Sequence, residues 1–212
     1  MKRKFCIAIG ILMALSSQVW AQNLCQIEVN RDCPTGACYC TYQNANTRWN
    51  KRSLTWFSQD AGHGVQDWHN IWVLAAAIWQ QRLQAAQINL SLSYGQNAES
   101  SDIVVETGWW PVEGWDGCTN HRYDGNGRLS DVDILMNALR AGASTTIPPG
   151  GPSTSVERLA IAVHEFGHAL GLAHAPAGCN DIMIDPNARA QCTQGIGCNM
   201  NDAIAGLRSL YP

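Results

Sequence analysis

The sequence predicts a single α+β domain in which short strands surround a long first helix and precede a second helix. In several short segments apolar and polar residues alternate, as in half-buried strands, and in two longer segments apolar residues recur every three or four positions, as in helices. The chain has 212 residues and no evident internal repeat. Its length therefore fits one ordinary domain with a real core.

A secretory signal peptide is predicted over residues 1–21. A basic start precedes an apolar run from Phe5 to Leu15, and small residues lead to Ala21. The apolar run is too short to span a bilayer, so it does not fit a membrane anchor. We therefore expect cleavage after Ala21 and a secreted protein, or a periplasmic one if the source has an outer membrane.

The charge of the remaining chain limits its partners. The signal segment carries three of the 14 basic residues and none of the 17 acidic ones, which leaves residues 22–212 with a net charge of −6. An acidic chain without basic clusters argues against nucleic acid as the partner. No later apolar stretch approaches membrane length, so we expect no membrane insertion after signal removal, and we expect a monomer.

Cysteine usage agrees with export. Eight cysteines follow the signal segment, and an even number in an oxidising compartment indicates up to four disulfides. The last three are an odd group, so complete pairing requires at least one of them to bond elsewhere. Cys118 is the simplest partner, and a bond to one of the first four is the alternative. The candidate disulfide residues are Cys25, Cys33, Cys38, Cys40, Cys118, Cys179, Cys192 and Cys198.

The secondary structure is expected in the following order. Residues 22–50 form an irregular, Cys-rich lead-in, and a long helix covers residues 67–83 with a Trp-rich face that we assign to the core. Asn126-Gly127 predicts a tight hairpin turn. A Gly/Pro-rich loop over 141–155 precedes the second helix, and a last helix covers 202–210. Strands are predicted over residues 52–57, 88–94, 103–106, 120–123 and 132–136.

The second helix carries a predicted metal site. His164 and His168 are four residues apart and therefore project from one face of the helix. If the helix continued, His174 would lie about 9 Å beyond His168 along the axis. The chain must therefore stop and turn back, and Gly171 is the residue best able to adopt the positive φ of such a stop. The three imidazoles are typical ligands of one catalytic Zn²⁺.

Glu165 is the predicted catalytic base. Three neutral imidazoles leave a fourth zinc position open for water, and the ion lowers the pKa of that water. Glu165 follows a ligand directly, so it lies beside the ion and is placed to take the proton of the water and deliver it to a leaving amine.

The stretch from His164 to His174 resembles the long zinc signature of metzincin-clan metallopeptidases and is most similar to the matrixin (matrix-metalloproteinase-like) family. The closing segment 202–211 is also similar to the last matrixin helix. The resemblance implies a metzincin-like catalytic domain over residues 51–212 with a twisted mixed sheet and a C-terminal helix. It further implies that Met183 forms a Met-turn beneath the zinc, and that the strand at 132–136 borders the cleft and pairs with substrate.

Other metal sites are not expected from the sequence. Asp124-Gly125-Asn126-Gly127-Arg128 partly matches a calcium loop, but Arg128 and the following Leu129 stand where a ligand and a glycine belong, so a hairpin is the preferred interpretation. Calcium thus remains possible but unsupported. His63, His69 and His121 are not expected to bind a metal.

The function predicted from the sequence is that of a secreted zinc-dependent endopeptidase acting on extended protein or peptide segments. The alternative is a catalytically silent zinc-binding interaction protein with the same fold. The presence of Glu165 favours the endopeptidase, because a binding protein does not need this carboxylate.

Overall fold

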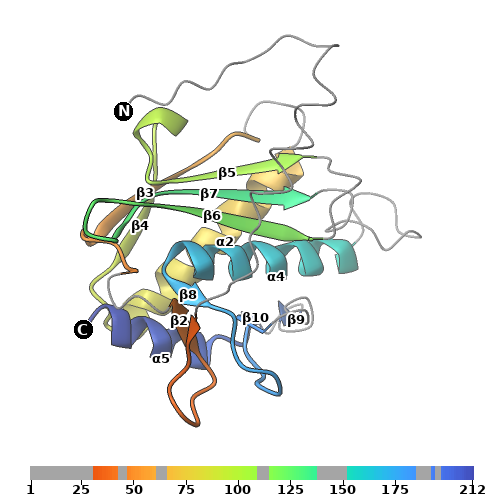
Figure 1. Ribbon diagram of the computed structural model, residues 1–212. Coiled ribbons are helices and arrows are strands. Elements are labelled where there is room, and N and C mark those ends of the chain that lie inside the picture. The colour runs from red at the N-terminus through yellow and green to blue at the C-terminus, as the bar shows by residue number, and fades with distance from the viewer. Residues whose placement is uncertain are drawn as a thin grey trace, which may run out of the picture.

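A five-stranded mixed sheet forms the centre of the computed structural model, which describes residues 31–42, 47–60, 66–108, 115–137, 152–184, 192–193 and 197–212 (Figure 1). The strand order is β4-β3-β5-β7-β6. β6 runs antiparallel to β7, whereas the other neighbours are parallel. The predicted mixed α+β architecture is thus confirmed. The strands are β3 (Ser53–Ser58), β4 (Ser91–Tyr94), β5 (Ile103–Gly108), β6 (Gly117–Tyr123) and β7 (Leu129–Asn137).

Two long helices, α2 (Gln66–Ala85) and α4 (Pro152–Ala169), pack against each other and against one face of this sheet (Figure 1). The predicted Trp-rich face of α2 is in the core, since Trp72 and Trp79 are fully buried. Trp72 and Trp56 of β3 each contact the ring of Phe166 on α4, with centroids 6.0 and 5.8 Å away. These aromatic contacts fix α4 against the sheet.

Two element boundaries differ from the sequence prediction. Residues 88–90 are irregular and do not join the strand, because they follow a turn at 86–87 in which Gln87 has a φ of +58° and the amide of Ile88 bonds back to the carbonyl of Leu83 on α2. Helix α4 begins at Pro152 instead of after Ser155. Proline is well tolerated at the first helical position, where its missing N–H has no partner in any case.

The expectation, implied by the matrixin resemblance, that the strand at 132–136 pairs with substrate is wrong. These residues belong to β7, which pairs with β5 on one side and β6 on the other. The edge strands of the described sheet are β4 and β6, and β6, the only antiparallel member among the five strands, is the edge next to β7. Sequence patterns show which segments form strands, but their order in the sheet depends on tertiary pairing.

A second, small sheet corrects the expectation of an irregular N-terminal lead-in. Strands β1 (Arg31–Asp32), β2 (Cys40–Tyr42) and β8 (Leu172–Ala173) pair antiparallel in the order β1-β2-β8. The N-terminal segment therefore lies beside the chain that follows α4. The other described elements are the 3₁₀ helix η1 (Ala98–Ser100), β9 (Cys192–Thr193), β10 (Gly197–Cys198) and α5 (Asn201–Leu210).

Disulfides tie the N-terminal segment to the body of the chain. Cys33 bonds Cys40, and Cys38 bonds Cys179. One of the last three cysteines therefore bonds to the first four, which was the second of the two alternatives, after Cys118. Cys118 and Cys198 are also disulfide-bonded. The signal peptide 1–21, Cys25 and most of the loop predicted over 141–155 lie outside the described residues. Among the described helices, none has the length and apolarity needed to cross a bilayer.

Candidate metal centre

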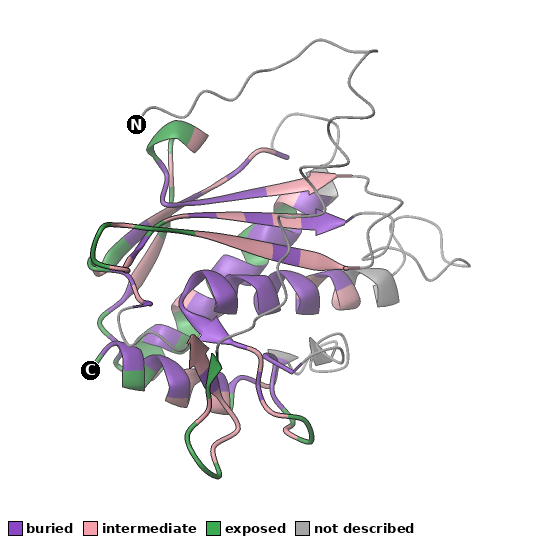
Figure 2. Ribbon diagram, in the orientation of Figure 1, coloured by how far each residue is buried: buried purple, intermediate pink, exposed green. Residues whose placement is uncertain are grey.

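Helix α4 brings His164 and His168 to one buried face. Both side chains are nearly inaccessible, and the whole stretch from 160 to 173 is buried between the sheet, α2 and the C-terminal part of the chain (Figure 2). The four-residue spacing places one imidazole a turn above the other.

The chain turns at Gly171 as predicted. Gly171 has a φ of +103°, and its amide donates to the carbonyl of His168 at 2.9 Å. A Cβ at this position would stand 2.9 Å from the carbonyl oxygen of Thr47. Both the backbone angle and the close approach therefore favour glycine. Strand β8 follows and returns His174 to the two histidines of α4.

The three imidazoles meet through their Nε2 atoms. The Nε2 of His168 lies 3.0 Å from that of His164 and 3.2 Å from that of His174, and the remaining pair is 3.1 Å apart. A tetrahedral zinc with Zn–N bonds of about 2.0–2.1 Å separates its nitrogen ligands by about 3.3–3.4 Å. The triangle fits such an ion, and it is the one group of potential metal ligands found among the described residues.

Hydrogen bonds on the far side of two rings set their tautomers. The Nδ1 of His164 lies 2.7 Å from the carbonyl of Ile182, and the Nδ1 of His168 lies 2.8 Å from the carbonyl of Leu172. A carbonyl only accepts, so each Nδ1 carries the proton and each Nε2 presents a lone pair to the centre. Lone pairs at these distances repel one another unless a cation lies between them, which supports a metal site.

Electrostatics keep these rings neutral. Burial lowers the pKa of His164 to about 3; the neighbouring His174 lowers it as well, while the hydrogen bond to Ile182 acts in the opposite direction. Burial also lowers the pKa of His168 well below 6.5. Neutral imidazole is the form that binds zinc.

Glu165 lies between α4 and the edge strand β6. The hydroxyl of Thr119 on β6 donates to its Oε2 at 2.6 Å. The carboxylate also lies against Gly117, where an added Cβ would stand 2.5 Å from Oε1. The side chain is buried, with 5% of its surface exposed. The position next to the histidine triad therefore holds a carboxylate that is oriented by a strand.

One face of β6 supplies contacts that the sequence analysis did not assign. Gly117, Thr119 and His121 alternate along the strand and therefore face α4 together. The Nε2 of His121 donates to the carbonyl of His168 at 2.9 Å, so this histidine binds the helix backbone. The strand predicted over 120–123 includes His121 but not Gly117 or Thr119, and nothing in the sequence identified the partner helix.

Tyr42 is a second residue that the sequence analysis missed. It comes from β2, and its hydroxyl lies 3.2 Å from the Nδ1 of His168. Its ring also packs edge-on against His121, with centroids 4.8 Å apart. No local pattern indicates this role, because Tyr42 is distant from His168 in sequence.

Met183 and Asp181 shape the floor of the centre. The sulfur of Met183 lies against Gly167 of α4, between the two helix ligands in sequence. Asp181 is fully buried, and its carboxylate accepts from the amides of Met183, Asp202 and Ala203 at 3.2, 2.9 and 3.2 Å. It thus joins the turn at Met183 to the start of α5. Burial raises the pKa of Asp181 to about 6, although the three amide bonds act in the opposite direction.

The zinc-free chain is expected to lose stability as the pH falls below 6.5. The unfolded chain then takes up protons on His164 and His168, whereas the folded chain keeps them neutral, His164 down to about pH 3. The free energy of unfolding therefore falls with pH, by up to about 1.4 kcal/mol per pH unit for each ring. The buried His121, whose pKa burial also lowers, adds to this loss. Asp181, between about pH 3.8 and 6, and Glu106, whose pKa burial raises, act in the opposite direction. We expect a net loss on the order of 2 kcal/mol between pH 7 and 5.

Urea unfolding of the chelated protein at the two pH values measures this loss. A His164→Leu/His168→Leu variant is the control, because it should show a much weaker dependence. Equal unfolding free energies of the unsubstituted chain at pH 7 and 5 would contradict the assignment of buried neutral rings.

The loop at Asp124 is a hairpin turn. The Oδ1 of Asp124 accepts from the amides of Asn126 and Arg128, and Gly127 has a φ of +76°. These backbone bonds lower the pKa of the Asp124 carboxyl. The carboxylate that suggested calcium therefore closes the turn, as the preferred hairpin interpretation predicts.

Comparison with known proteins places this site in context. A family model described as Matrixin matches residues 41–212. Matrix metalloproteinase-17 of Homo sapiens is 27% identical over 143 residues, covering 63% of this chain and 22% of that protein. Matrix metalloproteinase-25 of Mus musculus is 26% identical over 152 residues, covering 67% and 23%. The chain therefore spans less than a quarter of the length of these curated relatives.

A solved structure, the GM1 bound form of the ECX AB5 holotoxin, is similar at 13% identity with a TM-score of 0.40 and covers 75% of this chain and 80% of that chain.

Proposed function

Because the chain belongs to the matrixin family, we propose that it is a secreted zinc-dependent endopeptidase that hydrolyses peptide bonds in extended protein substrates. The observation that carries the proposal is the convergence of three Nε2 atoms beside the buried carboxylate of Glu165. His164, His168 and His174 would hold the zinc. The disulfides of the chain support an oxidising compartment.

The zinc, Glu165 and Thr119 would each have a separate role in the reaction. Zinc bound there would supply a Lewis acid that activates a water nucleophile and polarises the scissile carbonyl. Glu165 would accept the proton of the water and donate it to the leaving amine. Thr119 would hold one carboxylate oxygen, so that Glu165 needs little reorientation during the reaction.

The edge strand β6 would bind the substrate. Its outer side has no partner strand in the described sheet, and its inner face contacts Glu165 and the backbone of His168. An extended peptide that adds to this edge through main-chain hydrogen bonds would run past the metal centre. This arrangement favours an endopeptidase, because strand addition requires no chain terminus.

Cleavage of casein by the zinc-loaded protein tests the proposal. We expect fragments with new internal N-termini, detected by mass spectrometry, because the substrate strand would extend beyond the scissile bond on both sides. Intact casein after prolonged incubation, with one zinc bound per chain, would instead favour the silent zinc-binding protein.

A further inference from the structure

The N-terminal segment 31–42 lies directly against the chain that carries the third ligand. In the β2–β8 pair, Cys40 is opposite Ala173 and Thr41 is opposite Leu172. Cys40 and Ala173 are both fully buried. Strand β8 ends immediately before His174, so the pairing fixes the backbone on the N-terminal side of this ligand.

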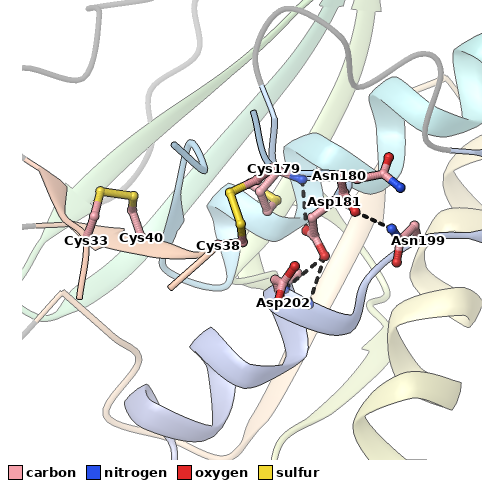
Figure 3. The surroundings of a disulfide bond; sticks show 10 residues. Cys33, Cys38, Cys40, Cys179, Asn180, Asp181, Asn199 and Asp202 are labelled. Carbon is pink, nitrogen blue, oxygen red and sulfur yellow. Dashed lines mark hydrogen bonds between the residues drawn. A yellow bond between two sulfur atoms is a disulfide. The ribbon is translucent and has the colours of Figure 1, made fainter. Parts of the chain in front are cut away.

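The same segment reaches the other side of His174 through a covalent bond. The Cys38–Cys179 disulfide joins it to the turn that follows the ligand (Figure 3). Between the two attachments, Nη1 of Arg31 donates to the carbonyl of His174 at 3.3 Å. His174 therefore lies between a strand ladder and a disulfide that both come from residues 31–42. The residue after it, Ala175, is also bonded to the body of the chain, since its amide donates to the carbonyl of Met183 at 2.8 Å.

The chain beyond this turn is held by other elements. Asp181 binds the first amides of α5, the amide of Ile182 donates to the carbonyl of Asn199 at 2.8 Å, and the side-chain amide of Asn199 donates to the carbonyl of Asn180 (Figure 3). By contrast, the turn 176–179 is largely exposed and closes on itself through the amide of Cys179 and the carbonyl of Pro176. The disulfide is thus the covalent anchor at the exposed end of the ligand loop.

We propose that the Cys38–Cys179 disulfide positions His174, so that firm zinc retention depends on the formation of this bond. His164 and His168 are preorganised by one buried helix, whereas His174 is partly exposed on a loop. Opening the bond gives this loop more conformations, and fewer of them place the third imidazole on the ion. Loss of a group that orients a metal ligand typically weakens metal binding by 10–100-fold.

Formation of the bond follows ordinary thiol–disulfide exchange. Cys38 and Cys179 together lose two protons and two electrons, and the disulfide of an exported oxidoreductase becomes a dithiol. Both cysteines are partly exposed, so an oxidoreductase or a small-molecule reductant can reach them. This consequence rests on the proposed endopeptidase function. Because zinc retention depends on the Cys38–Cys179 disulfide, the chain is weakly active in a reducing compartment and becomes active after export.

Zinc transfer to a chromogenic chelator tests the proposal on the full chain without reference to cleavage. The test variant is Cys38→Ala/Cys179→Ala. The matched control is Cys33→Ala, which opens the Cys33–Cys40 disulfide of the same segment but leaves Cys40 in its place opposite Ala173. We expect zinc release 10–100-fold faster from the test variant and changed less than threefold in the control. Equal release rates from the test variant and the unsubstituted protein would overturn the proposal.

Stepwise reduction of the unsubstituted protein covers the case in which the test variant does not fold. Disulfides are mapped by mass spectrometry at each step, and bound zinc is measured in the same samples. Faster zinc release after Cys38–Cys179 has opened supports the proposal. An unchanged rate of zinc release after this bond has opened contradicts it. A protein that holds zinc in this disulfide-dependent way but never cleaves casein would refute the endopeptidase function alone.

Discussion

Replacement of Glu165 by Gln is expected to lower kcat for peptide cleavage by about 10²–10⁴-fold, the usual contribution of a general acid–base. The amide has nearly the same shape, and its oxygen still accepts from the hydroxyl of Thr119, but it cannot take a proton from water. The three histidines are unchanged, so one zinc should remain bound per chain. A fluorogenic peptide assay measures kcat, and elemental analysis measures the zinc.

The neighbouring Thr119 provides a graded comparison for this experiment. Thr119→Ser keeps the hydroxyl that binds Oε2 of Glu165 and should retain most of the activity, whereas Thr119→Val removes it and should show intermediate activity. If Glu165→Gln kept more than a tenth of the unsubstituted kcat with zinc bound, another group would have to be the base.

Removal of zinc by a strong chelator is expected to abolish cleavage and to leave the chain folded. The nucleophile and the polarising charge are lost together, while the core around α2 and α4 and the two mapped disulfides remain. Thermal stability should also fall, because an ion that binds only the folded state at 1,000 times its Kd adds about 4.1 kcal/mol. Cleavage assays and thermal unfolding followed by circular dichroism, before and after chelation, measure both effects. Added zinc should restore the cleavage activity and the thermal stability.

His174→Ala is the control for zinc removal. It keeps the two helix ligands but leaves the site incomplete, so its cleavage should already be near background and should respond little to the chelator. Full cleavage by the chelated, unsubstituted protein would refute a zinc mechanism.

The part of the site that lies on α4 was predictable because it depends on local geometry. The spacing of His164 and His168 fixes their common face, and the positive φ at Gly171 was inferred from the need to turn back. The helices and the strands of the main sheet were also recognisable from their hydrophobic periods. Each of these inferences uses interactions within a few residues along the chain.

The rest of the site depends on contacts between distant segments. Tyr42 and His168, whose side chains are in contact, are 126 residues apart in the sequence. Cys38 and Cys179, which form a disulfide, are 141 residues apart. Neither a hydrophobic period nor a cysteine count identifies such partners, since eight cysteines allow 105 pairings. The expectation that the strand at 132–136 pairs with substrate, which the family resemblance implied, also failed because strand order depends on distant contacts. The pattern identified a strand but contained no information about its neighbours.

The complete burial of residues 160–173 has a consequence for how this chain can vary in evolution. Most substitutions in this stretch change the packing of the core and the geometry of the histidine triad at once, so selection on abundance and selection on chemistry act on the same positions. A descendant that adopts a new substrate has little freedom to adjust the metal centre itself. Its useful variation should instead accumulate in exposed positions around β6 and in the turn at 176–179, where a change of side chain leaves the core intact.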